Sequence, residues 1–558
     1  MFLSFLKNNT IAACILIAAI AVAPFHSTAQ STDKYSEKNW QLMDLKEDSV
    51  YGTSVNKAYA ELLKGKKPHR VIVAVIDAGL DTAHEDLQGH IWTNKKEIAG
   101  NGIDDDHNGY VDDIHGWNFI GGKNDNITNE SLESYREYYR LRPVYGTITD
   151  STKVPSGKMS EYDYWLKLQK GFVADSLKTV ARIKRITPIV TSLKTTDSLW
   201  EALLHKDTVY VSDIKTTIAT DSTHKTEDSL GNNVIHYYGM RHIPDNLSLE
   251  ELYSNATDAL KGQQATLASY STDPNARRKE VVGDDPFNIN DRNYGNNNVD
   301  AGVPSHGTHV SGIIAAVRNN GIGMDGITDD VLIMPIRAVP DGDERDKDIA
   351  LAIRYAVNNG AEVINMSFGK PFSPGKKWVD DAVKYADSKD VLIVHAAGND
   401  NNDLDTADDF PSAVFLNSAA VAPNIITVGA SAGGPDSLLA AVFSNYGQKR
   451  VDVFAPGVNV YSTIPGNKYA SYSGTSMATP VVTGIAALIL EYYPNLTAEQ
   501  VKYVIEHSAT KFPGLMVKKP GSDKMVPFSS LSVTGGIVNA YSALKLAATL
   551  QGKRNLKK

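Results

Sequence analysis

Short runs of apolar, mostly β-branched residues recur along much of the chain, and each run is continuous instead of alternating with polar positions. A continuous run suits a strand that is buried on both faces, as in a parallel sheet covered by helices. The clearest run occupies residues 71–76 and ends at Asp77. Four further runs follow it, at residues 331–336, 362–366, 391–395 and 425–428.

Stretches with helical spacing separate these runs. Residues 348–358 and 376–386 show helical patterns, and residues 477–492 read as an apolar helix. The alternation of strands and helices predicts an α/β fold with a doubly wound, mainly parallel sheet and helices on both faces. Ligands of such sheets bind beyond the carboxyl ends of the strands, so functional residues are expected there.

Residues 124–285 have a different composition, with few glycines, many Thr, Ser, Lys and Asp residues, and long stretches of helical spacing. This pattern predicts a mostly helical insertion in the α/β domain. One apolar stripe recurs at three- and four-residue steps: Tyr162, Trp165, Leu166, Phe172, Val173, Leu177, Val180 and Ile183. We expect a helix or a helical hairpin whose stripe packs against the main domain. The alternative is a substrate-restricting lid or a partner-binding arm.

The N-terminus has the pattern of a secretory signal peptide over residues 1–29. A short segment with one lysine precedes an apolar run of 13 residues at 11–23, and small residues lie before Gln30. The run is too short to span a membrane as a helix, and an uncleaved anchor is the alternative. We expect an exported protein, located in the periplasm, at the cell surface or outside the cell. No later stretch is apolar enough to predict a membrane span.

The only cysteine of the chain, Cys14, lies inside this apolar run, so the exported chain would contain none. This excludes a cysteine nucleophile and a fold held by disulfides. Hydrophobic residues amount to 42%, which suits a globular protein, and the formal net charge of −9 argues against a nucleic-acid binder. We expect a monomer.

These patterns divide the chain into five parts. After the signal peptide, an N-terminal strap is predicted over residues 30–69. The α/β domain comprises residues 70–123 and 286–548, interrupted by the helical insertion. Residues 549–558 form a basic tail that is expected to be solvated.

Three short segments carry the residue types of nucleophilic catalysis. They are residues 75–81 (VIDAGLD), 306–312 (HGTHVSG) and 474–480 (GTSMATP). A serine such as Ser476 needs a base to take its proton, and a histidine such as His306 titrates near neutrality. Asp77 could fix the tautomer of the imidazole. Each residue alone would also suit a helix cap, a packed histidine or a turn, but the three together favour catalysis.

These segments, in the order Asp, His, Ser, resemble those of the subtilases, the subtilisin-like serine proteases. The resemblance covers the α/β domain and implies that Asp77, His306 and Ser476 form a catalytic triad. It also implies that Asn399, at the end of the segment VHAAGN, donates its side-chain amide to the oxyanion. Asp77 and His306 are 229 positions apart, much farther than is usual in the family, so the insertion must loop out.

The same resemblance implies how a substrate binds. Two segments would form the walls of the pocket for the side chain before the scissile bond: Ser367, Phe368 and Gly369 on one side, and Ala396, Ala397 and Gly398 on the other. Protein or peptide substrates would bind in extended conformation through main-chain pairing. Acidic clusters at residues 341–348 and 400–409 suit a solvated surface or, alternatively, a preference for Lys or Arg near the scissile bond.

Two groups of oxygen-bearing side chains suit calcium. The resemblance implies that Asp86 and Asn320 are calcium ligands, because they match such positions in the subtilases. Asp104, Asp106 and Asn108 are in register with the first half of an EF-hand loop whose closing glutamate is absent. An Asp/Asn-rich turn is the alternative for the second group. One or two structural calcium sites are therefore expected, and no organic cofactor.

Taken together, the motifs predict a secreted serine endopeptidase. A non-catalytic peptide- or protein-binding member of the same fold is an alternative, with the insertion as its working surface. An esterase would share the chemistry, but the Gly-x-Ser-x-Gly elbow of such enzymes is absent around Ser476.

Overall fold

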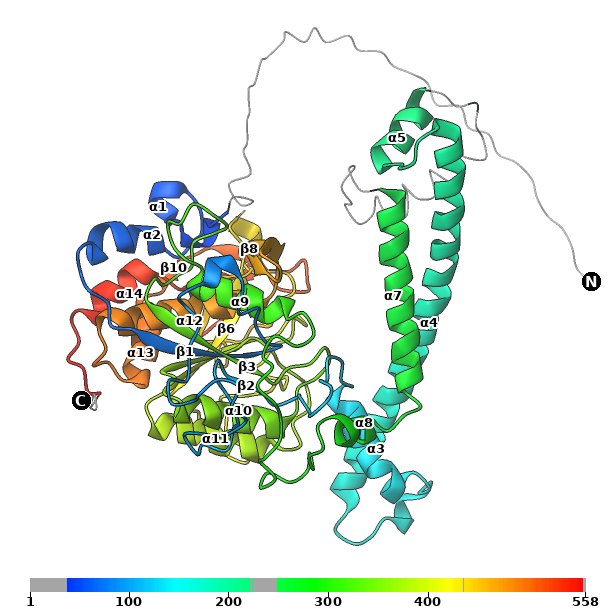
Figure 1. The fold of residues 1–558 in the computed structure, drawn as a ribbon, viewed down its shortest axis with the longest axis horizontal. Helices are drawn as coiled ribbons and strands as arrows, with labels where there is room; N and C mark the ends of the chain where they lie inside the picture. The colour runs from blue at the N-terminus through cyan, green and yellow to red at the C-terminus, as the bar shows by residue number, and fades with distance from the viewer. Residues whose placement is uncertain (1–37, 221–222, 224–247, 435, 555–558) are drawn as a thin grey trace, which may run out of the picture.

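The computed structural model describes residues 38–220, 223, 248–434 and 436–554 (Figure 1). The predicted signal peptide lies outside the described residues. Both ends of the described chain lie on an α/β domain, whereas the middle of the chain forms a helical arm that projects from it (Figure 1).

A nine-stranded sheet lies at the centre of the α/β domain, in the order β10-β13-β7-β6-β5-β4-β1-β3-β2. Every neighbouring pair is parallel except β10 with β13, so the predicted mainly parallel sheet is confirmed. All five apolar runs of the sequence form strands of this sheet. Its strands are β1 (Val71–Asp77), β2 (Trp117–Asn118), β3 (Val331–Arg337), β4 (Val363–Met366), β5 (Leu392–Ala396), β6 (Ile425–Ser431), β7 (Val453–Pro456), β10 (Thr510–Lys511) and β13 (Gly536–Ile537).

Helices cover both faces of the sheet because successive residues of a strand point to opposite sides. In β1, Val71, Val73 and Val75 belong to one hydrophobic cluster, while Ala74 and Ile76 belong to another. The first cluster contains residues of α9 (Ser305–Ala315), α12 (Thr475–Tyr492), α13 (Ala498–Ser508) and α14 (Ala540–Ala547). The second contains residues of α10 (Asp346–Asn358) and α11 (Lys376–Ser388), which lie on the other side of the sheet (Figure 1).

Helix α12 corrects one expectation from the sequence. Among the described residues it is the one helix that is long and apolar enough to cross a membrane, although no such stretch was expected after the N-terminus. However, 89% of the helix is buried inside the protein, where it packs against α9 and the sheet. A central helix is surrounded by apolar neighbours on all sides, which explains why its sequence lacks a polar face.

The ends of the described chain pack onto the domain. From the predicted strap, Trp40, Leu42 and Val50 are buried in the same cluster as α12. The expectation of a solvated basic tail is wrong for Arg554, whose guanidinium pairs with Glu362 and Asp390 and is 11% exposed.

The remaining short elements connect the larger ones. The helical turns are η2 (Trp40–Leu42), α1 (Leu45–Asp48), α2 (Val55–Ala58), η3 (Tyr59–Leu63), η4 (Glu85–Leu87), η5 (Ser151–Lys153), η6 (Asp436–Leu438) and η7 (Phe528–Ser530). Two antiparallel ribbons are formed by β8 (Val460–Ile464) with β9 (Lys468–Tyr472) and by β11 (Met516–Lys518) with β12 (Met525–Pro527).

The insertion is helical, as predicted. Its helices are α3 (Glu133–Tyr145), α4 (Met159–Leu204), α5 (Val211–Thr220), α7 (Leu249–Ser269) and α8 (Pro274–Val281). Helices α4 and α7 lie side by side as a hairpin, the projecting arm of Figure 1. The far end of this arm has its own apolar cluster, which includes Leu193, Trp200, Ile214 and Leu249.

The prediction that one stripe of α4 packs against the main domain is wrong in large part. Tyr162 and Trp165 are buried, but they pack with residues of α3, and Phe372 is the partly buried residue of the main domain that joins them. Leu166, Val173 and Leu177 of the stripe are 38%, 52% and 64% exposed. The arm points away from the domain, so no described residue of the domain covers the outward side of α4.

Candidate active site

Asp77 and His306 meet at the carboxyl end of β1. Asp77 is the last residue of that strand and is 1% exposed, and His306 is the second residue of α9. The Oδ1 atom of Asp77 accepts hydrogen bonds from the N–H of Ala78, at 2.8 Å, and from His306 Nδ1, at 2.7 Å. A proton on Nδ1 leaves Nε2 of His306 as the lone-pair nitrogen, the tautomer that a general base needs.

The negative charge of Asp77 affects the pKa of His306. Burial lowers the pKa of His306, but the negative charge and the hydrogen bond of Asp77 outweigh it and raise the pKa above its usual 6.5. The imidazole stays accessible, with 40% of its side chain exposed. The second histidine of the motif behaves differently: burial lowers the pKa of His309 to about 4, and its Nε2 hydrogen bonds with the carbonyl of Ala470. His309 is therefore a packed, neutral histidine.

Ser476 lies in the first turn of α12, which packs against α9. Its hydroxyl donates to the carbonyl oxygen of Ser367 at 3.0 Å, and the hydroxyl of Ser367 donates to the carbonyl of Ser476 at 3.0 Å. Within the described residues, the structure has no hydrogen bond between Ser476 and His306. Contacts between nucleophile and base are often long before substrate binds, so this geometry does not disqualify the pair.

Asn399 is oriented by the residue before Ser476. The N–H and the hydroxyl of Thr475 donate to Asn399 Oδ1, at 2.8 and 3.0 Å, so Nδ2 is the end of the amide that remains for another acceptor. A β-carbon built on Gly474 would lie 3.6 Å from Ser476 N and 3.7 Å from Asn399 Nδ2. Since first-turn N–H groups lack partners within a helix, two N–H donors border the same space.

The two predicted pocket walls follow β4 and β5, which are neighbours in the sheet. Ser367 hydrogen bonds with Ser476, as described above, and the N–H of Gly398 donates to the Thr475 hydroxyl at 3.2 Å. His395 Nε2 lies 2.8 Å from the carbonyl oxygen of Phe368, and burial lowers the pKa of His395 to about 4. One wall therefore contacts Ser476 and the other contacts Thr475, and an uncharged histidine joins the two walls.

The first predicted group of calcium ligands comes together. Asp86 is completely buried, and its Oδ1 accepts a hydrogen bond of 2.6 Å from Asn320 Nδ2. Its Oδ2 accepts the N–H of Met324 at 3.3 Å. Burial raises the pKa of Asp86 despite these donors. The nitrogen of the Asn320 amide faces the carboxylate, and its Oδ1 accepts the N–H of Ile322 at 3.0 Å. The Asp86 carboxylate and Asn320 Oδ1 are hard oxygens of the kind that calcium prefers.

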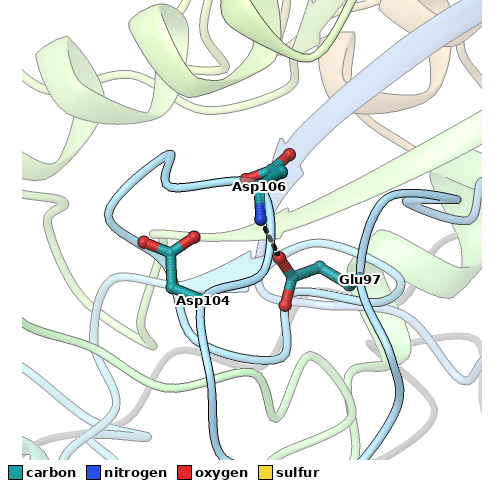
Figure 2. A group of neighbouring side chains, drawn as sticks. All are labelled: Glu97, Asp104 and Asp106. Atoms are coloured by element: carbon teal, nitrogen blue, oxygen red, sulfur yellow. Dashed lines mark hydrogen bonds between the residues drawn. The ribbon is translucent and has the colours of Figure 1, made fainter.

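The second group gains a residue that the sequence did not suggest. Figure 2 shows Glu97 beside Asp104 and Asp106, with one oxygen of each carboxylate within 4.8 Å of the others. The N–H of Asp106 donates to Glu97 Oε1 at 3.1 Å. Glu97 precedes the EF-hand-like motif by seven positions, so no motif could have indicated it. Three carboxylates this close repel one another unless a cation or protons neutralise them.

Asn108, the third predicted ligand of that group, is close to it but has other partners. Its N–H donates to both Asp104 and Asp106, at 3.0 and 3.1 Å. Its side-chain oxygen accepts the N–H of Tyr110, and its amide donates to Asp113. Whether Asn108 binds a metal stays a prediction.

Known proteins resemble the chain over most of the α/β domain. The model of the subtilase family matches residues 69–527. A thermophilic serine proteinase of Bacillus sp. (strain AK1) is 36% identical over 286 residues, which cover 50% of this chain and 65% of that protein. Thermitase of Thermoactinomyces vulgaris is 36% identical over 264 residues, which cover 46% of this chain and 86% of thermitase.

A solved protease structure from Pseudoalteromonas arctica PAMC 21717 is 31% identical, with a TM-score of 0.35 over 43% of this chain and 70% of that one. The extent of the family match and the coverage of thermitase decide the assignment. The chain belongs to the subtilase family, the subtilisin-like serine endopeptidases.

Proposed function

We propose that this protein is a secreted serine endopeptidase that cleaves peptide bonds through an acyl-enzyme. The observation that carries the proposal is the 2.7 Å hydrogen bond between the buried Asp77 and His306, whose helix packs against the helix with Ser476 in its first turn. Its substrates are proteins or peptides in extended conformation. Export rests on the predicted signal peptide, and the final location is the periplasm, the cell surface or the medium.

Acylation follows from the positions of these groups. Ser476 Oγ attacks the carbonyl carbon of the substrate while its proton moves to Nε2 of His306. The oxygen that becomes negative accepts hydrogen bonds from Asn399 Nδ2 and the N–H of Ser476. His306 then gives its proton to the leaving nitrogen, the C–N bond breaks, and the acyl group remains on Ser476 as an ester.

Deacylation repeats these steps with water. His306 takes a proton from the water molecule, whose oxygen attacks the ester carbon, and the proton returns to Ser476 Oγ as the ester bond breaks. Asp77 stabilises the imidazolium that forms each time. Since His306 must be neutral to act as a base, its raised pKa predicts that the rising limb of kcat/KM against pH has its midpoint above 6.5.

Labelling with a fluorophosphonate tests the proposal directly, because such probes react with activated serines. We expect covalent labelling of the folded wild type at Ser476, and cleavage of a peptide library, with both lost in Ser476→Ala. Ser473→Ala is a matched control on the same loop, since Ser473 hydrogen bonds with Asn459 outside the proposed machinery. Folded wild-type protein that neither labels nor cleaves would support the non-catalytic binding protein instead.

We also infer that calcium stabilises two loops of the peptidase domain. Asp86 and Asn320 would hold one ion, and Glu97, Asp104 and Asp106 would hold another. In both groups the donors are hard oxygens, as calcium requires. Each ion would neutralise buried or crowded carboxylates. The first would also cross-link two segments that are distant in sequence, and the second would hold one loop, so both roles are structural.

Melting curves with and without a chelator test this inference. We expect EDTA to lower the Tm by at least about 5 °C and calcium to restore it. The double variant Asp104→Asn/Asp106→Asn should lose part of the response, whereas Asp105→Asn, between them, should keep it. A Tm that EDTA leaves unchanged would remove both sites.

A further inference from the structure

The carboxylate of Asp409 lies against both of the predicted pocket walls. Gly369 belongs to one wall and Gly398 to the other, and a β-carbon built on either glycine would come within 3.0 Å of Asp409 Oδ2. Because neither position carries a side chain, no side chain of these two residues separates the carboxylate from the space between the walls. Main-chain hydrogen bonds between Lys370 and Phe410, of 3.0 and 2.9 Å, hold the two segments together.

The surroundings of Asp409 are acidic. Burial contributes most to raising its pKa, and the charges of Glu344, Asp400 and Asp343 raise it further. Its Oδ2 atom is buried and accepts no hydrogen bond from any described residue, and the same is true of Glu344 Oε1. Burying a carboxylate costs free energy unless a cation or a proton neutralises it. The surroundings of Asp409 therefore favour the binding of a positive charge.

The neighbouring cations have other partners or lie too far away. Lys370 Nζ donates to Glu133 Oε2 at 2.8 Å. A cavity of about 50 Å³ beside Asp409 is also lined by three cations: Lys449, Arg450 and Lys502. Among the described residues, no Lys or Arg nitrogen comes within 4.0 Å of the Asp409 carboxylate. The nearby His395 supplies no charge, because burial keeps it neutral.

We propose that Asp409 is a specificity-determining residue that selects substrates with lysine or arginine immediately before the scissile bond. The proposal rests on the proposed endopeptidase function, because the walls matter only if a peptide is cleaved at Ser476. A basic side chain between the walls would bring its cationic end to the unpaired oxygen and form a charge-assisted hydrogen bond. The nearby carboxylate of Asp400 would strengthen the attraction.

The acidic cluster at residues 400–409 has two explanations, a solvated surface and a preference for Lys or Arg, and each applies to a different residue of the cluster. Asp408 has the properties of a solvated surface residue, since its side chain is 76% exposed and lies 3.9 Å from Arg450. Asp409, one position later, is turned toward the pocket walls. The two neighbours therefore form a natural pair of test and control positions.

Substrates that differ only in the residue before the scissile bond test the proposal. Lysine, arginine, glutamate and norleucine are compared, norleucine being an uncharged analogue of lysine. The wild type should cleave the lysine and arginine substrates with kcat/KM at least about tenfold above the norleucine substrate. Asp409→Asn should remove most of this ratio by lowering kcat/KM for the lysine and arginine substrates, and Asp408→Asn should keep the ratio.

The wild type alone provides a second measurement, in case Asp409→Asn does not fold. Benzamidine, a small cation similar to the end of arginine, should inhibit cleavage of the norleucine substrate competitively. Equal kcat/KM for lysine and norleucine, no inhibition by benzamidine, or an unchanged ratio in folded Asp409→Asn would each overturn the inference and leave the proposed function intact. Failure to cleave any substrate, with no labelling of Ser476, would overturn the proposed function itself.

Discussion

The α/β domain and the helical arm bury their residues to very different extents. Sixteen of the 18 residues of α12 are buried, whereas only seven of the 46 residues of α4 are. The first helix lies at the centre of a large apolar core, and the second lies along a hairpin open to solvent (Figure 1). Stability gained from apolar burial scales with buried area, so the two regions must be stabilised by different means.

The arm is joined to the domain through buried ion pairs. Arg278 of α8 is completely buried, and its guanidinium pairs with Asp284, at 2.6 Å, and with Asp348 of α10, at 2.7 Å. Glu133 of α3 likewise pairs with Lys370 of the domain at 2.8 Å. Ion pairs have stricter geometry than apolar contacts, so they fix the orientation of the arm at its base.

The largest expected effect follows from breaking the buried ion pairs at the base of the arm. Arg278→Met leaves two buried carboxylates without their common partner, and we expect it to lower the free energy of unfolding by about 3–5 kcal/mol. Urea unfolding measures the loss, and Arg277→Met, one position earlier on the exposed side, is the control. If the free energy of unfolding of Arg278→Met lay within about 0.5 kcal/mol of the wild-type value, these ion pairs would not be what holds the arm.

An effect of similar size is expected in catalysis from a variant that leaves the ion pairs at the base of the arm unchanged. If Asn399 donates to the oxyanion as proposed, Asn399→Ala should lower kcat about 10²- to 10³-fold, a magnitude known from subtilisin and not from this chain. The KM should change little, because the interaction strengthens only in the transition state. The exposed neighbour Asn402 provides the control Asn402→Ala. A lower Tm with normal kcat would assign Asn399 a structural role instead.

Local sequence patterns predicted what depends on local chemistry. Continuous apolar runs gave the strands, because a strand buried on both faces needs an apolar residue at every position. The segments around Asp77, His306 and Ser476 were recognisable for the same reason: each role needs a particular residue at a particular strand or helix end.

Features that depend on distant segments could not be predicted. Glu97 joins Asp104 and Asp106 only after the loop folds, and Asp409 reaches the pocket only because its segment is bonded to the chain at Lys370. The exposure of Leu177 has the same origin, since spacing along a helix does not tell which side another helix will cover.

A smaller effect concerns the dependence of stability on pH, which a buried carboxyl group causes and an apolar core does not. Burial raises the pKa of Glu344 to about 8 in the folded protein, against 4.5 for a free side chain. Between these values the folded state keeps a proton that the unfolded state has released, so stability falls as pH rises, by up to about 1.4 kcal/mol per pH unit. Glu344→Gln should flatten this fall in urea titrations from pH 5 to 9, whereas Glu280→Gln, at an exposed position, should not. An unchanged slope in Glu344→Gln would show that this carboxyl is ionised in the folded protein.

The smallest effect is expected from shortening the arm, because the described residues of its far end pack only on one another. The apolar cluster there combines Trp200 of α4, Ile214 of α5 and Leu249 of α7, and it contains no residue of the α/β domain. Replacing residues 193–252 by a short glycine-serine loop should therefore leave the Tm of the domain and kcat/KM for short peptides within about twofold of the wild type. If the arm also restricts access, as a lid would, kcat/KM for a folded protein substrate should rise in the same variant. A loss of short-peptide cleavage would contradict the separation of the two regions and place the arm within the catalytic unit.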